Sequence, residues 1–305
     1  MSVELPGHGS HALSTFAGTA ATTRLNWATS NWTLSADGCY FDQGFRADAG
    51  FVTQAGIRGG HANLARRWWG GSDRWFTQIR LNVGTWNNRD FAGNQINGGG
   101  FFGLEYQGPG QSRIGIYPNF AMKEHFAGTT YAGMKQLWFN AYAAPSGMLS
   151  GGLDGTIGDA IDFANERLGS ETRLSPSVTL RLGRNVEVTV RHTYQRMSRD
   201  GAEVFTANLS QLRGVYNFSP RSFFRVILQY QQPDRALDRY VDDVDASTQQ
   251  LFAQLLYAYK MNPQTVLFLG YSQDGDGLVD PDRQRVPLTT RGRTFFLKIG
   301  YASRP

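Results

Sequence analysis

The feature that most constrains this chain is an alternation of apolar and polar side chains that returns in segment after segment. In the last such segment, 294–302, every second residue from Phe295 to Tyr301 is apolar, whereas Lys298 and Gly300 lie between them. Because successive side chains of a β-strand point to opposite faces, this pattern predicts a strand with one apolar and one polar face. A membrane β-barrel needs such strands, since lipid contacts one face and the lumen the other. No run approaches the roughly 18 apolar residues of a helical span, so the pattern predicts an all-β fold.

A large soluble antiparallel sandwich is the alternative fold, because its strands alternate as well. The exposed face of a sandwich would be rich in Lys, Glu and Thr, whereas the polar positions here are mostly Gly, Ala, Gln and single Arg residues. Charged residues make up 18% of the chain, which is low for a soluble protein. We therefore expect an antiparallel transmembrane β-barrel of about 14–16 strands in the bacterial outer membrane.

Charge and cysteine content narrow the function classes. The net charge is +5, but Arg is spread singly along the strands without a basic run, which argues against nucleic acid as a partner. Basic lumen residues, or arginines that meet anionic lipid headgroups, explain the charge. The single cysteine, Cys39, excludes a disulfide framework and a cysteine-rich metal site, and we expect no cofactor.

The alternation predicts fifteen strands, which are joined by short and longer connections in turn. Short periplasmic turns and longer extracellular loops are typical of bacterial barrels. The expected strands lie at 11–24, 29–41, 59–70, 74–87, 94–107, 111–121, 130–143, 148–160, 171–182, 186–197, 203–217, 221–232, 246–261, 264–273 and 292–303. The short turns are expected at 27–31, 70–73, 108–110, 145–147, 183–185, 217–220 and 261–264. The longer loops are expected at 42–58, 88–93, 122–129, 161–170, 198–202, 233–245 and 274–291.

The ends of the chain lead to an expectation about completeness. Residues 1–9 contain no charged n-region, apolar h-region or cleavage site, so either a signal has been removed or the chain is part of a longer one. Fifteen is an odd number, and the first and last strands would both descend toward the periplasm, whereas bacterial barrels have an even count. Either one strand is divided wrongly, within 44–67, or an ascending strand is missing. We expect 1–10 to be a flexible segment and 11–305 one barrel domain, with a missing ascending strand supplied by an upstream domain or a second chain.

Three C-terminal segments carry a family resemblance. Residues 216–230, 262–271 and 293–301 resemble the C-terminal barrel of an uncharacterised Gram-negative family of outer-membrane proteins, and 45–58 is similar to an internal motif of that barrel. The similarity extends over most of 12–303 and is strong in the last hundred residues. Members of the family carry an N-terminal sandwich similar to family-nine carbohydrate-binding modules. The resemblance implies an outer-membrane barrel linked to saccharides, and it brings no catalytic residues.

The inward positions of the strands give a candidate lumen lining. It comprises Arg181, Glu187, Arg191, Arg225, Gln229 and Lys298. Lumenal charges are costly unless they are paired or hydrated. Two interpretations follow: a pore lining that selects solutes by charge, and a ladder of cross-strand ion pairs that fills the lumen.

Two further sites are weaker hypotheses. His192 falls on the lipid face near Tyr194, but no Gly-x-Ser-x-Gly elbow is present and we expect no serine beside it on that face, so we interpret it as interfacial packing rather than as part of a hydrolase. The expected loop after residue 273 places Asp274, Asp276 and Asp280 at alternate positions, as in part of a calcium loop, although the full spacing and the terminal Glu are missing.

The sequence therefore predicts a barrel that is not an enzyme. The first interpretation is a channel or receptor for small polar solutes. The second is a plugged structural barrel that anchors a periplasmic or surface partner. Outer-membrane lipid and lipopolysaccharide are the expected surroundings, and acidic outer loops would meet lipopolysaccharide through divalent cations.

Overall fold

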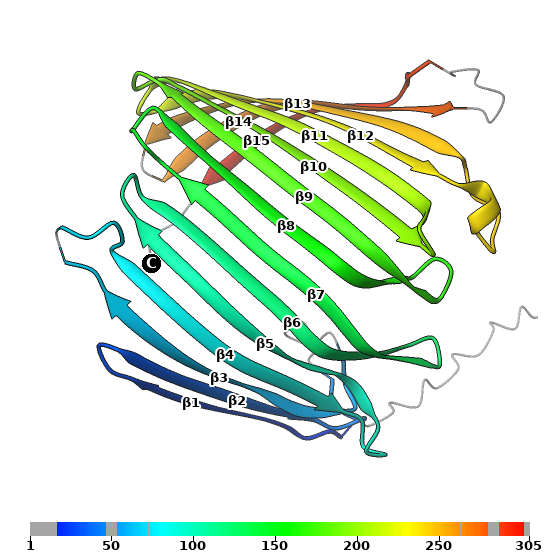
Figure 1. Cartoon of the computed structure of the whole chain (residues 1–305). Coiled ribbons are helices and arrows are strands. Elements are labelled where there is room, and N and C mark those ends of the chain that lie inside the picture. Colours follow the sequence, from blue (N-terminus) through cyan, green and yellow to red (C-terminus); the bar gives the residue numbers. More distant parts are fainter. Residues whose placement is uncertain (1–16, 47–53, 72, 263, 280–286, 302–305) are drawn as a thin grey trace, which may run out of the picture.

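The computed structural model describes residues 17–46, 54–71, 73–262, 264–279 and 287–301. They form one sheet of fifteen strands, in which each strand pairs antiparallel with its neighbours in sequence, so the expected all-β architecture is confirmed (Figure 1). The strands are β1 Ala20–Ala28, β2 Trp32–Phe41, β3 Ile57–Trp69, β4 Gln78–Arg89, β5 Gln95–Gly108, β6 Ser112–Phe126, β7 Thr129–Ala143, β8 Leu149–Asp162, β9 Arg167–Leu182, β10 Val186–Arg199, β11 Ala202–Ser219, β12 Ser222–Arg235, β13 Ser247–Asn262, β14 Thr265–Val279 and β15 Thr289–Tyr301. A 3-10 turn, η1 Leu237–Arg239, lies between β12 and β13. No helix in the described part of the chain is long and apolar enough to cross a membrane.

Cross-strand partners in an antiparallel pair point to the same face, so the register assigns every side chain to one side of the sheet. One row of partners across β9–β12 is Val178, Val190, Leu212 and Leu228. All four are exposed, by 37–50%. Similar rows on this face continue from Leu25 on β1 to Leu297 on β15, both of which are exposed as well. The apolar face of the sheet is therefore its outer, uncovered face.

The opposite face is polar and more crowded. The neighbouring row across β9–β13 is Ser177, Arg191, Gln211, Gln229 and Phe252. Several of the most buried side chains lie on this face, where small residues sit beside large ones. They include Ala65, Asn82, Leu256 and Ala258, none of which is more than 8% exposed. The polar face is therefore the inner side of the curved sheet seen in Figure 1.

The first strand and several connections differ from the expected positions. Strand β1 begins at Ala20, where it pairs with Phe41, and the expected start at residue 11 lies outside the described residues. Two connections expected to be long, 122–129 and 198–202, are tight turns at 127–128 and 200–201. In both turns the two central residues have positive φ, 48° and 77° in the first and 52° and 77° in the second. Such turns match the twist of paired strands, so the strands on either side continue to the turn.

The remaining connections keep part of the expected asymmetry. The three longest connections follow β2, β12 and β14, and these strands all end at the same end of the sheet, which we call the loop end. At the other end, the turn end, the connection between β3 and β4 is longer than expected, at 70–77, and the others are short. The sheet therefore has one end with long loops and one with mostly tight turns.

The two edge strands run in the same direction, because the strand count is odd and every pair is antiparallel. Strands β1 and β15 do not pair with each other, and the sheet of described residues stays open between them. All nine residues of β1 are exposed.

Candidate functional site on the polar face

The structure brings the six expected lumen residues to one face of the sheet. They occupy the polar face on β9, β10, β12 and β15, as Arg181, Glu187, Arg191, Arg225, Gln229 and Lys298. Their shared face follows from the alternation, which places polar residues at every second position. Their role as a lumen lining remains a prediction.

Glu187 is the centre of an ion-pair group on this face. Its carboxylate lies 3.1 Å from Nε of Arg181 on β9 and 3.5 Å from a guanidinium nitrogen of Arg213 on β11. Each pair is half exposed, so we expect each to contribute at most about 1 kcal/mol. One glutamate between two arginines leaves an excess positive charge. Arg213 was missed as a candidate, although its place in the alternation of β11 would have indicated it.

The other expected residues have different surroundings. Arg225 donates a hydrogen bond to Gln254 at 3.0 Å, and its buried Nε has no partner. Gln229 accepts one from Gln211 at 3.3 Å. Within the described residues, Arg191 and Lys298 form no ion pair. The ladder interpretation thus fits Glu187, whereas the charge-selecting interpretation fits the unpaired cations.

Further along the same face lies a second polar group that the sequence did not single out. Glu171 is 6% exposed, lies 2.7 Å from Arg173 and accepts a hydrogen bond from Gln195 at 2.6 Å.

All charged residues of 171–182, 186–195, 207–217 and 223–231 lie on the polar face. They are the five arginines 173, 181, 191, 213 and 225 and the two glutamates 171 and 187, which gives a net charge of +3.

On the outer face, tyrosines mark the level at which apolar residues give way to polar ones. The Tyr230 hydroxyl donates to Gln232 at 2.9 Å, and that of Tyr271 donates to Gln273 at 2.6 Å. At the turn end, Ser222 donates to the Tyr257 hydroxyl at 2.9 Å. Tyrosines with an apolar ring and a hydrogen-bonded hydroxyl are typical of membrane–water interfaces.

The expectation that no serine lies beside His192 is wrong. The register of β10 and β11 places Ser210 directly opposite, and its Oγ lies 2.9 Å from His192 Nδ1. Ser210 is also opposite Tyr230, so the pair lies at the level of the tyrosines. Among the described residues, no third group hydrogen-bonds the other imidazole nitrogen, as an oriented catalytic base would require. The geometry is that of a cross-strand hydrogen bond at an interface.

The calcium candidates lie differently from the expected loop. Asp274 and Asp276 belong to β14, which continues to Val279, and Asp276 forms an ion pair with Arg291 at 2.7 Å. Asp280 lies outside the described residues. Within those residues, no three potential ligand side chains gather in a way that would hold a metal ion.

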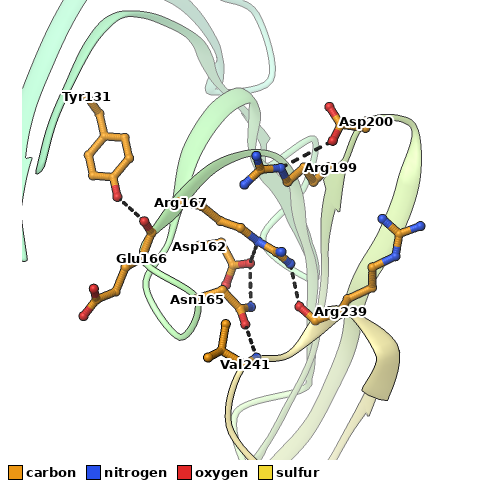
Figure 2. Close-up of polar contacts among 9 residues, drawn as sticks. All are labelled: Tyr131, Asp162, Asn165, Glu166, Arg167, Arg199, Asp200, Arg239 and Val241. Atoms are coloured by element: carbon orange, nitrogen blue, oxygen red, sulfur yellow. Dashed lines mark hydrogen bonds and ion pairs between the residues drawn. The ribbon is translucent and has the colours of Figure 1, made fainter.

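At the loop end, the connection 236–246 is bound to the turn between β8 and β9 (Figure 2). Asn165, which is 9% exposed, donates to Asp162 at 2.7 Å and accepts from the backbone of Val241 at 3.0 Å. Arg167 bridges the same Asp162, at 3.1 Å, and the carbonyl of Arg239, at 2.7 Å. This group of contacts, which sequence spacing gave no means to find, holds the loop across four intervening strands.

Comparison with known proteins gives similarities of fold. No protein-family model matches the chain, and no curated protein matches it either, so the family resemblance of the C-terminal segments remains a prediction. Among solved structures, the outer-membrane channel DcaP of Acinetobacter baumannii is similar over 93% of this chain and 84% of its own, with 12% identity and a TM-score of 0.48. OmpT of Vibrio cholerae, an outer-membrane protein, is similar over 91% of this chain and 99% of its own, with 10% identity and a TM-score of 0.40. An in-vitro folded form of the same OmpT covers 96% of this chain at 10% identity and a TM-score of 0.41.

Proposed function

We propose that this chain forms an outer-membrane β-barrel and that its polar face lines a channel for small polar solutes. The observation that carries the proposal is the outer face, which is apolar and exposed from β1 to β15. Soluble proteins rarely expose contiguous apolar patches larger than a few hundred Å². In a lipid bilayer, by contrast, the exposure of such an apolar face is favourable.

The height of the apolar face is close to that of the lipid-facing band of a membrane barrel. From Ser222 to Tyr230, β12 rises roughly 27 Å at about 3.4 Å per residue. A strand tilt of about 40° reduces this rise to roughly 20 Å along the membrane normal, close to the roughly 25 Å band of bacterial barrels. The polar side chains of Gln232 and Gln273 then lie just outside the band.

The charge of the polar face favours anions among polar solutes. Arg191 and the excess arginine beside Glu187 would give the lumen a positive potential, which raises the local concentration of anions. A saccharide link rests on the family resemblance alone. The second candidate is a docking barrel with a closed lumen, and the tightly packed inner residues such as Leu256 favour it.

Conductance measurements in planar bilayers distinguish the channel from the docking barrel. We expect the purified, folded protein to conduct, with a preference for chloride over potassium. Arg191→Glu should reduce or reverse that preference, whereas Arg199→Gln, at the loop end and ion-paired with Asp200, should leave it unchanged. Folded protein that inserts without conductance would contradict the channel and support the docking barrel.

We also propose that one ascending strand from outside residues 20–301 fills the seam between β1 and β15. The support is parity: both edge strands run in the same direction, so a single strand can pair antiparallel with both. The expected upstream domain or second chain would supply it. Enzymatic activity is not part of the proposal, because the His192–Ser210 pair lacks a third group among the described residues.

A further inference from the structure

We propose that the turn end of the sheet carries a binding pocket for a small organic anion with an apolar body. A cavity of about 620 Å³ lies on the inner side between the turns β9–β10, β11–β12 and β13–β14. This volume is within the range of small-molecule sites, which is about 300–1,000 Å³. The inference goes beyond the channel, because the pocket is built by the turns and the adjoining strand ends and does not require an open lumen.

The floor of the pocket is apolar. Phe223, Ala258 and Phe268 are successive cross-strand partners on the inner face of β12, β13 and β14, and all three line the cavity. Ala258 is only 2% exposed, so the accessible apolar surface comes from the two phenyl rings and from neighbouring apolar residues such as Val266, which also lines the cavity. A planar aromatic or aliphatic group would gain roughly 25 cal/mol per Å² of apolar area that it buries there.

The rim of the pocket is cationic. Arg184, Arg221 and Lys260 each come from a different strand pair, and all three are exposed. None of the described lining residues is a carboxylate, and these three cations form no ion pair within the described part of the chain. Three uncompensated positive charges above an apolar floor are suited to a ligand that carries a carboxylate, sulfonate or phosphate on an apolar body.

Hydrogen bonds between neighbouring turns hold the rim in place. Asn185 donates from its side chain to the carbonyl of Asn217 at 2.6 Å, and the Asn217 amide donates to the Asn185 carbonyl at 2.7 Å. The backbone of Lys260 donates to the Arg221 carbonyl at 2.7 Å. The three turns are therefore joined side to side before any ligand arrives, and such pre-organisation lowers the entropy cost of binding.

Calorimetry on the folded protein in detergent, with a micelle blank, tests the ligand class. The probes are naphthalene-2-carboxylate, the matched neutral naphthalene-2-carboxamide and inorganic phosphate. We expect saturable binding of the carboxylate and at least tenfold weaker binding of the other two. Equal binding of the carboxamide would show that the rim contributes nothing, and equal binding of phosphate would show that the floor contributes nothing; either result would overturn the proposal.

Substitutions test whether the carboxylate binds at this pocket. The double variant Arg221→Gln, Lys260→Gln keeps the backbone bond between the two residues, and we expect it to weaken carboxylate binding at least tenfold. The control Arg199→Gln removes one cation of β10 at the loop end and should bind as the parent does. Because these titrations need no conductance, a non-conducting protein that binds the carboxylate would refute the channel and keep the pocket. A double variant that folds and binds unchanged would refute the pocket.

Discussion

At the scale of residues, the position of a side chain on one face or the other decides what a substitution costs. Val226 lies midway between Ser222 and Tyr230 and, opposite Leu255, belongs to the apolar face. Val226→Arg would place a charge near the proposed bilayer midplane, where it costs roughly 2–4 kcal/mol. We expect this variant to fail to assemble, measured by heat-modifiable migration on gels.

The matched control is Gln229→Arg, on the same strand and the polar face, opposite Gln211. An arginine there would join a face that already carries Arg191 and Arg213, and we expect it to fold. Equal folding of both variants would contradict the assignment of the apolar face to lipid.

The hydrogen bond between His192 and Ser210 leads to a second residue-scale prediction. Cross-strand polar pairs contribute roughly 0.2–1 kcal/mol, so a double-mutant cycle with His192→Ala and Ser210→Ala should give a coupling within that range. The measurement is reversible unfolding in detergent. A lipid-ester hydrolysis that disappears specifically in Ser210→Ala would show instead that the pair is catalytic.

Alternation predicted which face each of these residues would occupy, because the side-chain period of a strand is two. It placed Arg191 and Gln229 together without any knowledge of pairing. It missed Ser210 as the partner of His192, because the same alternation fits registers that differ by two residues, and only the hydrogen-bonded pairing chooses among them. Asp274 and Asp276 were assigned to a loop, yet pairing with β13 keeps this stretch extended.

At the scale of elements, the loop 236–246 depends on a few buried contacts with the turn between β8 and β9. Asn165→Ala removes both the bond to Asp162 and the acceptor for Val241. Loss of a buried partner costs about 1–3 kcal/mol, so the open state of the loop should become at least about fivefold more populated. Trypsin should then cleave faster after Arg239. The control Asp242→Asn, on the exposed part of the loop, should leave the cleavage rate unchanged, and an unchanged rate in Asn165→Ala would mean that these contacts do not hold the loop.

The connections show why element boundaries were harder to predict than elements. All fifteen strands follow from the alternation, whereas the turns at 127–128 and 200–201 were overestimated in length. Each is an X-Gly pair with positive φ, and the strands remain paired up to the turn itself. Polar residues beside such a turn, such as Arg199, resemble loop residues by composition and are nevertheless paired within strands.

At the scale of the whole molecule, the two ends of the sheet should lie on opposite sides of the membrane. A cysteine in place of Asp242, in the loop-end connection 236–246, should react with an impermeant thiol reagent on intact cells. A cysteine in place of Ser219, beside the turn end, should react only after the outer membrane is opened. Cys39 must first be replaced by serine, because it is a free thiol of intermediate burial on β2. The reverse labelling pattern would invert the proposed topology.

The matching direction of β1 and β15 also bears on how these molecules meet one another. Every copy inserted by the same route has the same orientation, so the open edge of one copy always meets a neighbour's edge running the same way. Antiparallel pairing between copies is then forbidden by symmetry alone, at any density in the membrane. Only parallel pairing between copies remains, and the ascending strand proposed for the seam would cover both edges. We therefore expect cysteines at Leu25 of one copy and Leu297 of another not to cross-link, and efficient cross-linking would contradict the filled seam. An exposed edge that would be a hazard in solution thus loses, in a membrane, every antiparallel pairing with other copies, and only the slightly weaker parallel pairing is left to it.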